Sequence, residues 1–333
     1  MSSSAADLYP LKFSTIYIDK PWGGRTLEKF KGAIPDGLIG ETWDVSAQSQ
    51  GVSQVTNGPF AGQGLDEVTA RLGRAMLGSG PQAEHFPLMV RYVSSRENLS
   101  VQVHPTREYA LNRGELSGKD EAWYVLEAEP GAFVYAGVDP GVSVDRFRDS
   151  VHDGSVRDHL LARPVKPGDC LFIPAGTIHA IGAGITLIEI CETSNTTYRV
   201  YDYGRNRGLD IEETFANMDL SIRVGVHRGL TRGLEAGHET VLCLQPTMAM
   251  STVTVDGRQR LDTRATSFQV LSCLEGEGTL TGRTWSEATP IRQGESVVVP
   301  AEAEEFDVTG NLQLLRSWIP TDDEREELLH HVA

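Results

Sequence analysis

The chain has 333 residues, which suits about two domains, and 40% hydrophobic with 23% charged residues is typical of a globular protein. Its 46 acidic and 30 basic side chains give a formal net charge of −16. This balance argues against nucleic acid or an anionic membrane as a partner, since binding over either surface needs clustered cations.

The first seven residues have neither the basic start nor the apolar core of a signal peptide, so they indicate a short disordered tail. No apolar run reaches the roughly 18 residues of a membrane helix. Four cysteines are widely spaced, and three of them lie in apolar runs, which favours buried, reduced thiols over a disulfide framework. These features together predict a cytoplasmic protein.

Short strands dominate the expected secondary structure. Apolar and β-branched runs recur between turn signals, and the 34 glycines and 16 prolines are enough to supply the turns. This pattern predicts antiparallel barrels or sandwiches rather than alternating βα units. The clearest expected strands are Met89–Val93, Leu99–Val103, Trp123–Leu126, Phe133–Tyr135, Cys170–Ile173, Thr186–Cys191 and Tyr198–Tyr201.

Helices are expected in few places. Apolar residues from Leu65 to Met76 recur with a helical period that Gly78 ends. Two short helices, over 143–152 and 155–161, are expected on either side of Gly154. Capping-box patterns predict two more helices, and the pairs that carry them are Asp210 with Glu213 and Thr321 with Glu324.

A weak internal repeat connects the two halves of the chain. The segments that begin at Gly168 and Gly294 both read glycine, an acid, four apolar or small residues, and then Pro-Ala. An expected strand pair precedes each segment, so duplication of a barrel is the better interpretation. The copies differ where chemistry is expected, since the first has His179 and the second has Glu305 at the matching position.

Metal-ligating side chains gather in the first copy. Gln102 and His104 are two residues apart in an expected strand and therefore share a face, whereas Val101 and Val103 point to the other face. Lys119 and Glu121 alternate with Trp123 at the start of the next strand. Together with His179, these strands offer two imidazoles, a carboxylate and an amide oxygen, a set that suits Zn²⁺ with water or substrate completing the shell.

Charged residues in the next strands suggest an anion site. Glu189 lies within an apolar strand, which is costly unless the carboxylate is paired or functional. Arg199 follows in another strand, and Arg205 and Arg207 come shortly after it. These arginines form a local positive group that could bind a phosphate, or they could make ordinary salt bridges.

These motifs resemble those of a known family. The spacing from Gly168 through Pro174 and Gly176 to His179 resembles a cupin signature, and the whole chain from about 10 to 320 resembles short bacterial type I mannose-6-phosphate isomerases. The segments that carry this resemblance, in chain order, are PWGG near residue 21, GETW from residue 40, LSVQVHP from residue 99, GKDEAWYVL from residue 118, FIPAGTIHAIGAG from residue 172 and ETSNTTYRVYDYGR from residue 192.

The resemblance implies two cupin-type jelly-roll barrels, mainly β, with a few helices attached to the first. Residues 1–235 would form the barrel with the metal site, and residues 236–333 a degenerate, structural barrel. It implies a zinc-dependent aldose–ketose isomerase that interconverts mannose 6-phosphate and fructose 6-phosphate through a cis-enediol. The chain would be a monomer or a homodimer, with a sugar phosphate as its small-molecule partner.

The implied site residues fall into three groups. One Zn²⁺ per chain would be held by Gln102, His104, Glu121 and His179. Arg199 would stabilise charge, and Lys119 and Glu189 are both candidates for proton transfer. Substrate binding is assigned to Trp22, Ser100 and Arg205.

Two other functions stay open. Two histidines and a carboxylate also make an iron facial site, so a cupin dioxygenase is one alternative. A non-catalytic sugar-phosphate-binding protein is the other, although no helix-turn-helix or basic segment indicates a regulator.

Overall fold

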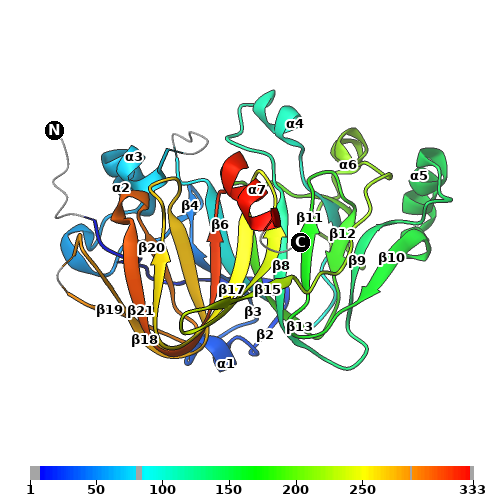
Figure 1. Ribbon diagram of the computed structural model, residues 1–333. Helices are drawn as coiled ribbons and strands as arrows, with labels where there is room; N and C mark the ends of the chain where they lie inside the picture. The colour runs from blue at the N-terminus through cyan, green and yellow to red at the C-terminus, as the bar shows by residue number, and fades with distance from the viewer. Residues whose placement is uncertain (1–7, 80–84, 286, 331–333) are drawn as a thin grey trace.

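The computed structural model describes residues 8–79, 85–285 and 287–330, and antiparallel sheets make up most of it (Figure 1). The mainly-β class expected from the sequence is confirmed. The expected disordered tail, residues 1–7, lies outside the described residues. Within them, no helix is both long enough and apolar enough to span a membrane.

Two sheets build the first barrel. The five-stranded sheet has the order β10–β9–β12–β7–β14, and its strands are β7 Val101–Val103, β9 Phe133–Val138, β10 Leu160–Pro164, β12 His179–Ile181 and β14 Tyr198–Tyr201. The six-stranded sheet has the order β11–β8–β13–β6–β3–β2, with β2 Ile16–Gly24, β3 Ile39–Val45, β6 Leu88–Ser95, β8 Glu121–Ala128, β11 Cys170–Ile173 and β13 Ile185–Glu192.

One eight-stranded sheet builds the second barrel. Three of its strands are long and bend around an apolar interior: β17 Ala249–Asp262, β18 Gln269–Gly282 and β21 Glu305–Trp318. The others are β1 Leu11–Lys12, β15 Leu230–Leu234, β16 Gly237–Leu244, β19 Thr289–Arg292 and β20 Ser296–Val299. A small hairpin pairs β4 Ala47–Gln48 with β5 Gly51–Val52. All seven strands expected from the sequence are present.

The six-stranded sheet is the middle layer of the molecule. Every residue of β6 is buried, and Val90 and Tyr92 share one core with Val298 and Leu315 of the second barrel. On the opposite face Val93 packs in the core of the first barrel. A strand that is buried on both faces is usually apolar along its whole length. A charged residue in such a strand has no access to water and therefore needs a partner.

The internal repeat has a structural counterpart. Gly168 and Gly294 both have a positive φ, of 87° and 83°, in the turn that enters β11 and β20. In each turn the acid after the glycine, Asp169 or Glu295, accepts a hydrogen bond from a backbone N–H at 2.9 and 3.1 Å. His179 then begins β12 and Glu305 begins β21. The two copies therefore have the same turn, but the first has a histidine and the second a glutamate at the position of the expected metal ligand.

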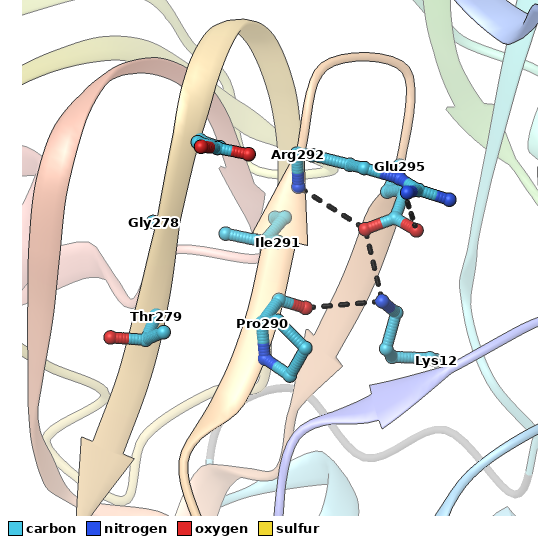
Figure 2. A pocket seen from close by; sticks show the side chains of 8 residues that line it. Lys12, Gly278, Thr279, Pro290, Ile291, Arg292 and Glu295 are labelled. Atoms are coloured by element: carbon cyan, nitrogen blue, oxygen red, sulfur yellow. Dashed lines mark hydrogen bonds and ion pairs between the residues drawn. The ribbon is translucent and has the colours of Figure 1, made fainter.

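The start of the described chain belongs to the second barrel. Strand β1 pairs with β20, and Lys12 bonds the carbonyl of Pro290 at 3.1 Å and the carboxylate of Glu295 at 2.9 Å (Figure 2). Strand β15 also pairs within this sheet. The division of the chain at residue 235 stays a prediction, because these pairings show only that the second sheet draws strands from both sides of it.

Helices cover the barrel ends and the outer face of the five-stranded sheet. Helices α5 (Val144–Asp153) and α6 (Ile211–Asn217) pack over Val101 and Val103, so these valines face away from Gln102 between them, as predicted. The helices and 3₁₀ turns are α1 Glu28–Lys31, η2 Gly58–Phe60, α2 Leu65–Leu72, α3 Arg74–Leu77, α4 Arg107–Leu111, α5 Val144–Asp153, η3 Val156–His159, α6 Ile211–Asn217, η4 Ala301–Ala303 and α7 Asp322–His330.

Three helix predictions need correction. Gly73, with φ of 52°, breaks the expected helix after Leu65 into α2 and α3. The expected helix over 155–161 is a 3₁₀ turn followed by β10, because the chain there joins the sheet edge beside β9. The helix expected after Asp210 is present as α6 with Asp210 at its N-cap, but the Asp210 carboxylate forms no capping bond, because it accepts the backbone N–H of Arg199 at 3.1 Å instead. The capping box of Thr321 and Glu324 is confirmed.

Candidate metal centre

A row of polar side chains crosses the five-stranded sheet on its inner face. Gln102 on β7 pairs with His179 on β12 and with Arg199 on β14. Residues directly opposite each other on antiparallel strands project to the same side. The register therefore places Arg199, Gln102 and His179 in line, facing the six-stranded sheet.

Glu121 reaches this row from the other sheet. It opens β8 and pairs with Cys191 on β13 and Ile173 on β11. Its carboxylate Oε1 lies 2.9 Å from His104 Nε2, and Oε2 lies 3.8 Å from His179 Nε2. One potential ligand atom from each of these three residues lies within 4.8 Å of the other two, and all three side chains are buried. The predicted His–Glu–His cluster is thus assembled from both sheets.

Both imidazoles present Nε2 to the cluster. His104 Nδ1 lies 2.9 Å from the carbonyl oxygen of Thr196, and His179 Nδ1 lies 2.9 Å from that of Thr177. A carbonyl can only accept a hydrogen bond, so each Nδ1 carries the proton and each Nε2 lone pair is free for a metal. Burial, with the charge of Lys119, lowers the pKa of His104 to about 4, and burial also lowers the pKa of His179. Both rings are therefore neutral at pH 7, as ligation requires.

The Glu121 carboxylate has the state and the free acceptor that a cation needs. Burial acts to raise its pKa, but Lys119 and His104 hold the pKa well below its usual value. Trp123 donates a hydrogen bond to Oε2 at 3.0 Å, whereas the buried Oε1 has no geometric hydrogen bond among the described residues and is balanced by the Lys119 ammonium 2.9 Å away. An ionised, buried oxygen beside two neutral imidazoles, which a cation already approaches, fits a divalent metal ion of the zinc type.

Gln102 lies beside the cluster with its amide nitrogen toward it. Nε2 is 3.3 Å from His179 Nε2, while Oε1 accepts a hydrogen bond from Ser100 at 3.2 Å. The two ends of an amide have nearly the same shape, so a half-turn of the amide would present Oε1 to a metal. Ser100 is therefore positioned to orient Gln102, as well as being a predicted substrate contact.

Lys119 touches the cluster directly. Its ammonium group is 2.9 Å from Glu121 Oε1 and 3.4 Å from His104 Nε2, and its side chain is buried. Glu189, the other candidate for proton transfer, is one step further away. Its carboxylate binds Arg91 at 2.6 Å, and Arg91 in turn lies 3.7 Å from Glu121.

Arg91 and Glu41 also line this side of the site, and neither was predicted from the sequence. Arg91 on β6 also binds Glu41 on β3 at 3.3 Å, and Glu41 binds Lys20 at 3.1 Å. The sequence does contain an indication of Arg91, because this charged residue interrupts an expected apolar strand in the same way as Glu189 does. The pairing of Arg91 with Glu189 in the strand register explains how the middle sheet accommodates both charges.

The remaining predicted residues lie in different surroundings. Arg199 has a buried Nε without a hydrogen-bond partner among the described residues. Arg205 is neutralised by Asp202 at 3.3 Å and Glu97 at 3.0 Å. Trp22 is buried in the same core as Trp123. Of the arginines expected to bind phosphate, Arg199 is the one that lies in the row with Gln102 and His179.

Replacement of Glu41 by glutamine tests the buried charge chain. Arg91 and Lys20 overcome the effect of burial and lower the pKa of Glu41 to about 2. A depressed carboxyl pKa contributes stability that is complete above the unfolded value near 4.5 and is lost as the pH falls toward 2. We expect Glu41→Gln to lower the free energy of unfolding at pH 7 by roughly 3 kcal/mol, the energy of a shift of this size.

Urea unfolding between pH 7 and 3.5 measures this effect. The difference between the natural chain and Glu41→Gln should shrink below about pH 4.5. Glu28→Gln, which removes an exposed carboxylate paired only with a near neighbour in sequence, is the control and should change little. A difference that stays constant over this range contradicts the assignment.

Comparison with known proteins agrees with this geometry. Residues 11–139 match the family model "Phosphomannose isomerase type I, catalytic domain", and residues 246–319 match "Mannose-6-phosphate isomerase, cupin domain". The mannose-6-phosphate isomerase of Streptococcus mutans is 36% identical over 92% of this chain and 98% of its own length. Mannose-6-phosphate isomerase ManA of Bacillus subtilis is 31% identical over 92% and 98%.

A solved structure matches over the same extent. The crystal structure of a mannose 6-phosphate isomerase from Bacillus subtilis superposes with a TM-score of 0.85 at 28% identity, covering 92% of this chain and 99% of that one. Near-complete coverage in both directions means that the whole two-barrel architecture, rather than one barrel, is shared. The chain belongs to the type I mannose-6-phosphate isomerase family, whose C-terminal module is a cupin domain.

Proposed function

We propose that this chain interconverts mannose 6-phosphate and fructose 6-phosphate with one zinc ion held by Gln102, His104, Glu121 and His179. The observation that carries the proposal is the buried His104–Glu121–His179 cluster, in a chain of this family. Nitrogen and carboxylate donors of this kind suit Zn²⁺ and leave room for substrate oxygens. When bound, the ion would polarise the oxygens at C1 and C2 and stabilise the negative charge that develops on them.

The chain's own residues supply the proton transfer. The reaction moves a proton between C2 and C1 of the sugar through a cis-enediol, and it needs a group that takes and returns this proton. We assign this role to Nζ of Lys119, which touches the cluster and would take the proton as the uncharged amine and return it as the ammonium. Glu189 is bound to Arg91, and its contribution is to hold Arg91 against Glu121.

Arginine side chains deal with the anionic charge of the substrate. The Nε of Arg199 is buried and lacks a hydrogen-bond partner among the described residues, so this guanidinium can donate to an oxyanion without first breaking a salt bridge. Arg205 must exchange Asp202 or Glu97 for a phosphate oxygen if it is to bind the substrate. Ser100 holds Gln102, and Trp22 closes the apolar wall beside Trp123.

A coupled assay on metal-loaded protein tests the function. Chelator-treated protein should be inactive, and stoichiometric Zn²⁺ should restore the conversion of mannose 6-phosphate to fructose 6-phosphate more fully than Mn²⁺ or Fe²⁺. Absence of turnover with every metal would overturn the isomerase assignment. Oxygen uptake by the iron-loaded protein would instead support a dioxygenase, and binding of mannose 6-phosphate without turnover would support a sugar-phosphate-binding protein.

A further inference from the structure

The mouth of the second barrel contains a cavity that the proposed reaction does not use. Its volume is about 140 Å³, and α7 contributes Glu324 to its lining. Below it the barrel interior is apolar, with Val253, Leu271 and Leu314 in one cluster. The lining of the cavity, in contrast to this interior, is charged and includes four arginines, Arg232, Arg260, Arg264 and Arg316.

The strand register places this cavity where the first barrel has its polar site. Arg316 pairs with Leu271, which pairs with Val297. In the first barrel Glu189 pairs with Trp123, which pairs with Leu171.

Leu171 and Val297 stand at matching positions of the repeat, so Arg316 is the counterpart of Glu189. By the same reasoning Ser251, which pairs with Arg316, is the counterpart of Arg91. The second barrel therefore has a polar mouth as well, with a largely buried arginine, whose side chain is 13% exposed, at the position of the buried Glu189.

Glu239 balances only part of this positive charge. Its Oε2 accepts hydrogen bonds from Arg232 at 2.6 and 3.0 Å, and its Oε1 accepts from Ser251 at 2.7 Å and from Arg316 at 3.3 Å. Both carboxylate oxygens are thus occupied by two guanidinium groups and a hydroxyl. The Nε of Arg316 is buried and has no partner within the described residues.

The other charged groups around the cavity are engaged elsewhere. Glu324 accepts hydrogen bonds from Thr321 and Thr266, and among the described residues no ion pair connects it to Arg316. Arg260 pairs outward with Asp307, and Arg264 pairs with Glu327. With Arg260 and Arg264 paired in this way, the two remaining arginines of the lining, Arg232 and Arg316, share the single carboxylate of Glu239.

We propose that this mouth is an oxyanion-binding subsite that takes one phosphate group on Arg316 and Arg232. A guanidinium presents paired N–H donors that match phosphate oxygens, and a partly desolvated site strengthens the attraction. The guanidinium of Arg316 lies over the ring of Trp318, 4.4 Å from its centroid, which holds the fork in place. The cavity is smaller than the roughly 300 Å³ at which whole-ligand pockets begin, so it suits a phosphate group rather than a complete sugar phosphate.

Calorimetric titration of the full chain with inorganic phosphate tests the proposal. The variants are Arg316→Gln, which leaves Arg232 and Ser251 on Glu239, and Arg283→Gln as the matched control. Arg283 is an arginine of the same barrel whose side chain is 85% exposed and which does not line the cavity. We expect the natural chain and Arg283→Gln to bind one more phosphate per chain than Arg316→Gln, or to bind it at least tenfold more tightly.

A second cavity variant and a second anion complete the experiment. Arg232→Gln changes a side chain that is 31% exposed, and it should weaken the same binding event without depending on the folding of Arg316→Gln. Acetate in place of phosphate separates a general carboxylate site from a phosphate site, and only phosphate should bind. Equal phosphate stoichiometry and affinity in the natural chain and both cavity variants, all with native circular dichroism, would overturn the proposal, as would equal binding of acetate.

Discussion

The His179→Ala variant should lose its bound metal and, with it, nearly all isomerase turnover. His179 is one of two imidazoles in the cluster, its Nδ1 is committed to the carbonyl of Thr177, and its Nε2 faces Glu121. Removal of one of two nitrogen ligands leaves a carboxylate, an amide and one imidazole, a set that binds zinc far more weakly. We expect metal content to fall from one ion per chain to below a tenth, and kcat to fall by at least about 10³-fold, because the charge stabilisation leaves with the ion.

Metal analysis of purified protein, alongside the coupled assay, measures both quantities. His152→Ala is the control, since His152 lies in the last turn of α5 and is exposed. It should keep full metal content and full turnover. A His179→Ala protein that keeps one metal ion per chain would remove His179 from the ligand set, whatever its activity.

The Arg199→Ala variant should keep its metal and lose turnover. Arg199 pairs with Gln102 in the register but is not one of the cluster's ligating groups. Loss of one charged group that stabilises developing negative charge typically costs on the order of 10²–10³ in kcat. We expect a fall of this size with metal content unchanged and a smaller change in KM, which separates a transition-state role from uniform binding.

Arg207→Ala is the matched control for this variant. Arg207 lies in the loop that follows β14, the strand that carries Arg199, and its guanidinium is held by Asp202 at 2.6 and 2.7 Å. It should keep turnover within a few-fold of the natural chain. Arg199→Lys, which keeps the positive charge without the planar fork, should recover part of the lost activity. Near-normal kcat in Arg199→Ala would reject the assigned role.

The strand pattern made much of the fold and the cluster predictable. The two-residue period of β7 places Gln102 on one face and the neighbouring valines on the other, and the structure confirms both faces. The turn residues around Gly168 and Gly294 specify the same local geometry in both barrels. Such local preferences act over a few residues, so they can be recognised in a single sequence.

Helix ends and charge pairing were harder to predict. Asp210 has the sequence pattern of a cap, yet its carboxylate bonds Arg199 because the two meet in space. Arg205 looked available for phosphate, and its partner Glu97 lies 108 residues away in the chain. Partners such as Glu97 depend on contacts between distant segments, which local spacing does not encode.

The sequence by itself determined the class of fold, the duplicated barrel and the residue types of the metal cluster, because each depends on short-range periodicity and turn chemistry. Only the tertiary structure decided which charges are paired. Packing of the six-stranded sheet between two cores buries Arg91, Glu41 and Glu189 together, and each becomes tolerable only through the others. At the mouth of the second barrel, the buried Nε of Arg316 has no hydrogen-bond partner among the described residues, and the low polarity of a barrel interior makes such an unmatched polar group costly.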